Sequence, residues 1–160
     1  MTLITAAWLR ERKACRRQVA DFEREWPEGA ELTKENLLRA AALSLDLDWF
    51  AEEILPEPAQ SAFGEATAGA WQANTNGFSR ELRAYNEALD AAWQARAAAY
   101  GCQADAEPAE LGYDEATARA DRAYDEATSA AVRIFHDAQA RALWRIIKHL
   151  DRDDLEVGDA

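Results

Sequence analysis

Two histidines and two repeated acidic pairs are the side chains in this sequence that could hold a metal ion. A metal-binding helical bundle needs carboxylates together with an acid three residues before a histidine. The residues at that position before His136 and His149 are an arginine and an isoleucine. The pairs Asp114-Glu115 and Asp125-Glu126 would lie about 16 Å apart along a helix, too far to share one ion. We therefore predict no metal site and interpret these acids as solvated helix faces.

A reactive thiol needs a basic and partly exposed environment. Cys15 lies beside Lys13 and Arg16, but it also shares an apolar stripe with Val19. A buried, unreactive Cys15 is the favoured interpretation, and a reactive thiol is the alternative. Cys102 is far away in sequence, and there is no Cys-x-x-Cys spacing. Both thiols are expected to be reduced, which indicates a cytoplasmic protein.

Other catalytic patterns are missing from the sequence. There is no Gly-x-Ser-x-Gly, no glycine-rich loop for phosphate and no zinc-ligand spacing. The sequence therefore predicts a protein that is not an enzyme and that uses no cofactor.

The elements that remain are helices, and the clearest of them repeats itself every eleven residues. The unit Tyr-Asp-Glu-Ala-Thr begins at Tyr113 and at Tyr124, and related units begin at Phe135 and Ile146. Eleven residues make about three helical turns, so each position returns to nearly the same face. This period predicts a long helix over residues 113–150.

The same register, more loosely kept, predicts an earlier helix over residues 57–100. Its turn-forming segment Asn74–Gly77 predicts a kink or a restart with Ser79 as the cap. Glycines and a proline then predict a bend over residues 101–112. Two helices joined by such a bend most simply form an antiparallel hairpin.

Alanine lines the repeats, so helices could approach closely while one aromatic per repeat fills the remaining space. Each aromatic can bury roughly 150–250 Å², which makes aromatic side chains the expected determinants of pairing. The side chains that we predict to pair the helices, or to pair two copies of the chain, are Phe63, Trp71, Tyr85, Trp93, Tyr113, Tyr124, Phe135 and Ile146. A stacking platform for nucleic-acid bases is disfavoured because these helices carry no net positive charge.

Residues 1–56 predict a separate head of three helices. Thr33 and either Asp46 or Asp48 have the sequence context of helix N-caps, and Pro56 closes the last helix. Residues 151–160 predict an acidic tail. The predicted fold class is therefore all-α: a small helical head, a long antiparallel hairpin over residues 57–150 with eleven-residue packing, and the tail.

The charge of the 160-residue chain is −12, and much of it lies near the end of the head. Residues 27–60 carry eight acidic and two basic side chains. Such a chain is repelled by phosphate, so no direct nucleic-acid binding is expected, and no apolar run is long enough for a membrane span. We predict a partner-binding patch, with solvated capping acids as the alternative, at Asp46, Asp48, Glu52, Glu53 and Glu57.

The head contains Ala14-Cys15, Trp26-Pro27-Glu28-Gly29 and Asp48-Trp49, and the Tyr-Asp-Glu-Ala-Thr repeats follow it. This order of motifs resembles that of a group of small uncharacterised phage and prophage proteins. No activity comes with it. The resemblance implies an accessory role in a mobile genetic element.

Two functions are favoured after these exclusions, and contact of a nucleic acid with the basic segment around Arg10 to Arg17 is a weaker third. The first is a phage-encoded inhibitor that docks its acids on a basic, nucleic-acid-binding surface of a host defence complex, in the manner of an anti-CRISPR protein. The second is a scaffold or assembly protein that self-associates, for example as a homodimer, and has no foreign target.

Overall fold

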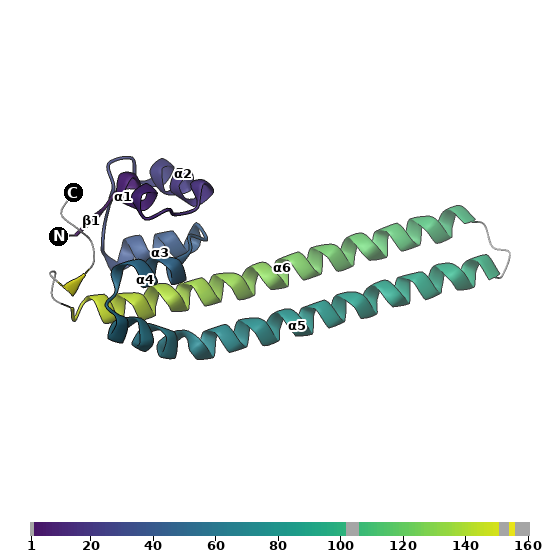
Figure 1. Ribbon diagram of the computed structural model, residues 1–160. Helices are drawn as coiled ribbons and strands as arrows, with labels where there is room; N and C mark the ends of the chain where they lie inside the picture. Colours follow the sequence, from purple (N-terminus) through teal and green to yellow (C-terminus); the bar gives the residue numbers. More distant parts are fainter. Residues whose placement is uncertain (1, 102–105, 151–153, 156–160) are drawn as a thin grey trace. The chain divides into compact units, whose positions relative to one another are not determined.

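The protein is all-α, as predicted, in a computed structural model that describes residues 2–101, 106–150 and 154–155 (Figure 1). The elements are β1 (Leu3–Ile4), α1 (Ala6–Glu11), α2 (Arg16–Glu25), β2 (Ala30–Glu31), α3 (Lys34–Ala42), α4 (Leu47–Ile54), α5 (Glu57–Gly101) and α6 (Ala106–Ile147). The chain divides into two compact units. Unit one comprises residues 1–71 and 133–160, and unit two comprises residues 72–132.

Unit one contains four short helices before α5, where the sequence analysis expected three. The extra break falls at Lys13, whose φ of 61° is incompatible with a right-handed helix. Cys15 follows this break at the N-cap position of α2 and is exposed. The prediction that Cys15 is buried was therefore wrong, because the stripe that contains Val19 starts only inside α2.

Side-chain caps start three of these helices. The hydroxyl of Thr5 accepts a hydrogen bond from the Trp8 backbone N–H, and that of Thr33 accepts one from Asn36 (both 3.2 Å). Of the two candidates for the cap of α4, Asp46 is the residue that accepts from the Trp49 backbone N–H, at 3.0 Å. Each cap satisfies a backbone donor that the first helical turn leaves without a partner.

A short antiparallel ribbon pairs Leu3 with Glu31 and Ile4 with Ala30. Gly29, which precedes β2, has a φ of 94°, and a Cβ atom at this position would lie 2.7 Å from the carbonyl oxygen of Ile4. Only glycine fits here without strain. The ribbon was not predicted, because two residues are too few to show an alternating pattern.

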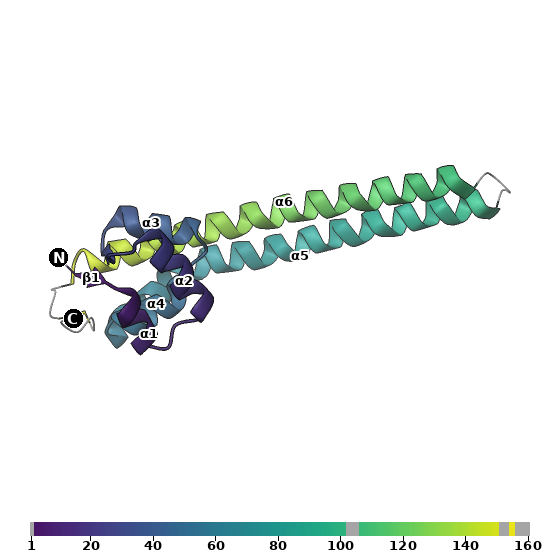
Figure 2. The ribbon, with the colours of Figure 1, turned by 90° about the horizontal axis from the view of Figure 1, so that it is seen from above.

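The apolar core of unit one combines the short helices with the N-terminal part of α5 and the C-terminal part of α6. Its most deeply buried large side chains are Ile54, Leu55 and Leu143. Figures 1 and 2 show α3 beside the C-terminal part of α6. Leu155 also joins this core, whereas most of the predicted tail over residues 151–160 lies outside the described residues. The predicted domain boundary at residue 56 does not separate two cores, because this one core contains residues on both sides of it, such as Leu55 and Phe63.

In unit two, α5 and α6 run antiparallel (Figure 2). Helix α5 continues without interruption through Asn74–Gly77, so the predicted kink is not found. The hydroxyl of Ser79 donates to the Thr75 carbonyl at 3.1 Å, which is a mid-helix contact rather than a cap. Helix α6 already begins at Ala106, so residues 106–112 are helical. The break is thus shorter than the predicted bend at 101–112.

Tyrosine side chains join α5 to α6 in unit two. The rings of Tyr85 and Tyr124 lie 5.3 Å apart between centroids, and the Tyr85 hydroxyl donates to Asp121 at 2.8 Å. This hydrogen bond raises the pKa of Tyr85. Alanines with little side-chain volume, such as Ala120, are buried nearby. In unit two, α5 and α6 therefore contact each other through the Tyr85 and Tyr124 rings and the hydrogen bond from Tyr85 to Asp121.

None of the helices in the described ranges is both long enough and apolar enough to cross a membrane.

Candidate protein-binding surfaces

Four exposed carboxylates lie at the N-cap of α4, within α4 and in the first turn of α5. These residues, which we call the acidic surface, are Asp46, Asp48, Glu52 and Glu57. Within the described part of the chain, no lysine or arginine forms an ion pair with any of them. The charge of these four carboxylates is therefore not neutralised by a lysine or an arginine of the described residues.

Glu53, the remaining predicted acid, is used inside the fold. Its carboxylate lies 3.1 Å from the Arg12 guanidinium, which also donates to the Glu53 backbone carbonyl at 3.2 Å. The same guanidinium lies over the Trp8 ring, 5.2 Å from its centroid. Glu53 thus joins α1 to α4 and is less available to a partner than its neighbours.

Asp48 is exposed as a residue, yet its carboxyl group lies against the buried side chain of Gln139 in α6. Burial of the carboxyl raises the pKa of Asp48, and the charge of Asp46 adds to this effect. The hydrogen bond from Gln139 and the proximity of His136 act in the opposite direction. Asp48 therefore binds a proton more readily in the folded chain than in the unfolded one.

The raised pKa of Asp48 leads to a pH-dependent prediction. Its contribution to stability is present below the unfolded pKa and is lost as the pH rises through the folded pKa. Asp48→Asn cannot titrate, so the melting temperature of this variant minus that of the unchanged chain should be larger at about pH 7 than at about pH 3. Thermal unfolding by circular dichroism measures this difference. A carbon-13 NMR titration midpoint for Asp48 at or below the ordinary aspartate value would contradict the prediction.

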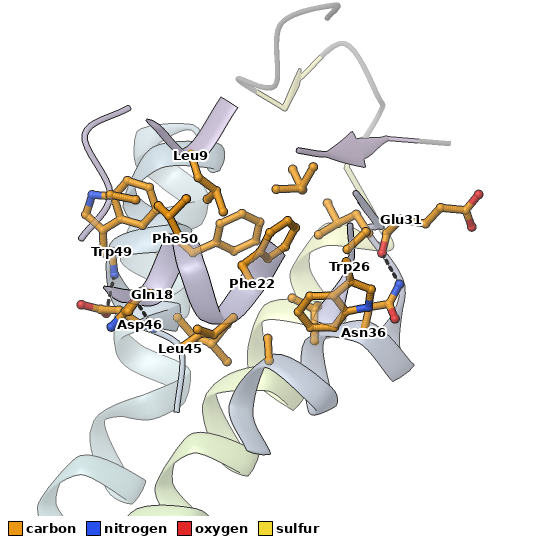
Figure 3. A pocket seen from close by; sticks show the side chains of 18 residues that line it. Leu9, Gln18, Phe22, Trp26, Glu31, Asn36, Leu45, Asp46, Trp49 and Phe50 are labelled. Carbon is orange, nitrogen blue, oxygen red and sulfur yellow. Dashed lines mark hydrogen bonds between the residues drawn. The ribbon is translucent and has the colours of Figure 1, made fainter. Parts of the chain in front are cut away.

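A cavity of about 60 Å³ lies among the short helices of unit one (Figure 3). Its walls are mostly apolar and include the rings of Phe22, Trp26 and Phe50. At its rim the Gln18 side-chain carbonyl accepts a hydrogen bond from the Asp46 backbone N–H at 3.0 Å. Binding pockets for drug-sized ligands measure roughly 300–1,000 Å³. The cavity is therefore too small to serve as such a binding site.

The predicted pairing residues divide into contacting and exposed groups. In unit two, Tyr85 contacts Tyr124, and the Arg96 guanidinium lies 5.1 Å from the Tyr113 ring centroid. In unit one, Phe63 is buried, and Phe135 and Ile146 are half-buried. By contrast, Trp71 and Trp93 are 55% and 60% exposed.

Sequence reasoning did not identify a polar cluster at the end of unit two. Arg96 forms an ion pair with Glu110 at 2.7 Å, and the Tyr100 hydroxyl donates to the same carboxylate. The hydrogen bond from Tyr100, together with the one from Arg96, lowers the pKa of Glu110. The only signal in the sequence was that Arg96 and Glu110, on opposite sides of the break, carry opposite charges. That signal does not show that the two side chains lie close together.

The described residues contain no group of three or more histidine, cysteine or acidic side chains arranged to hold a metal ion. The fold and its surfaces define an all-α protein with paired long helices and an acidic surface. Comparison of the chain with protein-family models, with curated proteins and with solved structures found no match.

Proposed function

We propose that this chain is a non-enzymatic binding protein that places its acidic surface on a basic surface of a partner protein. The observation that carries this proposal is the absence of any lysine or arginine ion pair at Asp46, Asp48, Glu52 and Glu57 within the described residues. Carboxylates already neutralised inside the fold would attract a basic partner only weakly. Complementary charge steers two proteins together and fixes their orientation.

The partner class follows from the same charge pattern. A basic surface that normally binds nucleic acid is built to face closely spaced negative charges. Carboxylates held on a short helix can occupy such a surface and compete with phosphates. Together with the resemblance to phage and prophage proteins, this supports a host defence complex of the CRISPR type as the target, and inhibition as the outcome.

Competition with a labelled target DNA for a purified, guide-loaded CRISPR effector tests the proposal. The unchanged chain should displace the DNA, and its affinity should fall by about tenfold or more between about 50 and about 300 mM salt. The variant Asp46→Asn/Asp48→Asn/Glu52→Gln/Glu57→Gln should displace it much less. Asn at residue 46 keeps a capping side chain for α4, so the fold is retained.

The matched control removes the same charge from exposed acids of α6 in unit two. It carries Asp114→Asn, Glu115→Gln, Asp125→Asn and Glu126→Gln. This control should compete as well as the unchanged chain. An equal loss in both variants would mean that only net charge matters, and no loss in the first variant would exclude the acidic surface.

A further inference from the structure

Large apolar side chains lie exposed along α5 in unit two. Leu82, Trp93 and Tyr100 are 48%, 60% and 46% exposed. Single exposed apolar residues are normal on protein surfaces. These three, however, are separated by eleven and seven residues, which correspond to about three and two helical turns. They therefore lie on one side of the helix.

Positions between and before these three extend this side into a continuous stripe. Its residues follow each other at spacings of three or four. We call this set the α5 stripe, and its members are Thr75, Phe78, Leu82, Asn86, Leu89, Trp93, Ala97 and Tyr100. None of them is charged, although 30% of the chain is. The neighbouring Arg96 is neutralised by its ion pair with Glu110. An uncharged stripe is poorly suited to a basic partner.

We propose that the α5 stripe binds the α5 stripe of a second copy of this chain, with the two helices antiparallel. Two copies related by a two-fold axis present the same surface to each other, so the surface must be complementary to itself. Placing Leu82 opposite the partner's Trp93 also places Phe78 opposite the partner's Ala97 and Thr75 opposite the partner's Tyr100. Large side chains then face smaller ones along the interface.

Charge alone opposes a second copy, because two chains of net charge −12 repel each other. The α5 stripe lowers this cost, because none of its own residues carries a carboxylate. The exposed parts of Leu82, Trp93 and Tyr100 amount to roughly 300 Å² per copy, judged from the area that each side chain can bury. Stable interfaces bury about 800 Å² per partner, so an interface centred on this stripe is expected to give a weak, reversible dimer rather than a permanent one.

Sedimentation equilibrium between about 1 and about 100 µM tests the proposal. The unchanged chain should dimerise, and more salt should tighten the dimer because it screens the repulsion between acidic chains. This salt dependence is opposite to that of binding through the acidic surface, so the two proposals fail independently. Trp93→Glu and Leu82→Glu should each weaken dimerisation at least tenfold, because they place a charge in the apolar interface.

Ala91→Glu is the matched control, since it adds the same charge to an exposed position on another side of α5. It should leave dimerisation unchanged, and circular dichroism should show equal helix content in every variant. A monomer at about 100 µM, or a dimer that survives both stripe substitutions, would overturn the proposal. So would a foreign protein that requires Trp93 while the chain itself stays monomeric.

A disulfide experiment tests the register. In chains carrying Cys15→Ser and Cys102→Ser, a Leu82→Cys chain is mixed with a Trp93→Cys chain and oxidised. The antiparallel arrangement predicts a crosslinked heterodimer, because the two positions face each other across the interface. Crosslinking in the Leu82→Cys chain alone that matches or exceeds the mixture would refute this register.

Discussion

Replacing Leu143 by alanine is expected to lower the free energy of unfolding by about 2–5 kcal/mol. Leu143 is 0% exposed and lies in α6 within the core of unit one. The substitution removes buried methyl groups and leaves a cavity that the surrounding helices fill only in part. Urea unfolding followed by circular dichroism measures the loss.

Ile134→Ala is the control for this prediction. Ile134 lies on the same helix but is 71% exposed. Its truncation removes little buried surface and introduces a better helix former, so the change should stay within about 0.5 kcal/mol. A change within about 0.5 kcal/mol for Leu143→Ala as well would mean that Leu143 does not lie in a packed core.

Gly29→Ala is expected to destabilise unit one by about 1–3 kcal/mol. The residue has a positive φ, and the new methyl group would lie 2.7 Å from the Ile4 carbonyl oxygen. The backbone would have to shift, which would pull β2 away from β1. The melting temperature should fall accordingly.

Gly69→Ala should act in the opposite direction. Gly69 lies inside α5, and nothing lies within 4 Å of the position that its Cβ would take. Alanine restricts the unfolded chain without creating a clash, so stability should rise by about 0.5–1 kcal/mol. A rise in stability for Gly29→Ala as well would contradict the conformation assigned to Gly29.

Local signals in the sequence predicted the fold class and most helix starts. Thr33 could be identified as a cap, and Asp46 as one of two candidates, because their partners lie only three residues away. The long helices could be predicted because one repeat spans about three turns. Such signals depend on neighbours in sequence and need no knowledge of the tertiary structure.

Where helices continue or stop against local preference, the sequence was a poor guide. Asn74–Gly77 has turn-forming residues but stays helical, because packing against a second helix can outweigh weak local propensities. Pro108 lies in the first turn of α6, where a missing backbone N–H costs nothing. At Lys13 the positive φ ends α1, although no glycine or asparagine marks the position.

The sequence predicted which residues make up the candidate surfaces, but not which of these residues are exposed and which are paired inside the fold. The ion pair of Glu53 with Arg12 joins residues 41 apart, so the sequence could not separate Glu53 from the exposed acids. Trp71 and Trp93 share a repeat position with each other but not with Tyr85. The repeat shows which residues lie in one column, whereas only the pairing of α5 with α6 decides which column is covered.

The contacts that join the two helices of unit two differ in how much chain they enclose. Tyr85 and Asp121 are 36 residues apart, whereas Arg96 and Glu110 are 14 apart. Closing the shorter loop costs about 0.8 kcal/mol less in chain entropy. Folding of unit two is therefore expected to start beside Arg96 and to proceed like a zipper toward Tyr85, which favours rapid folding.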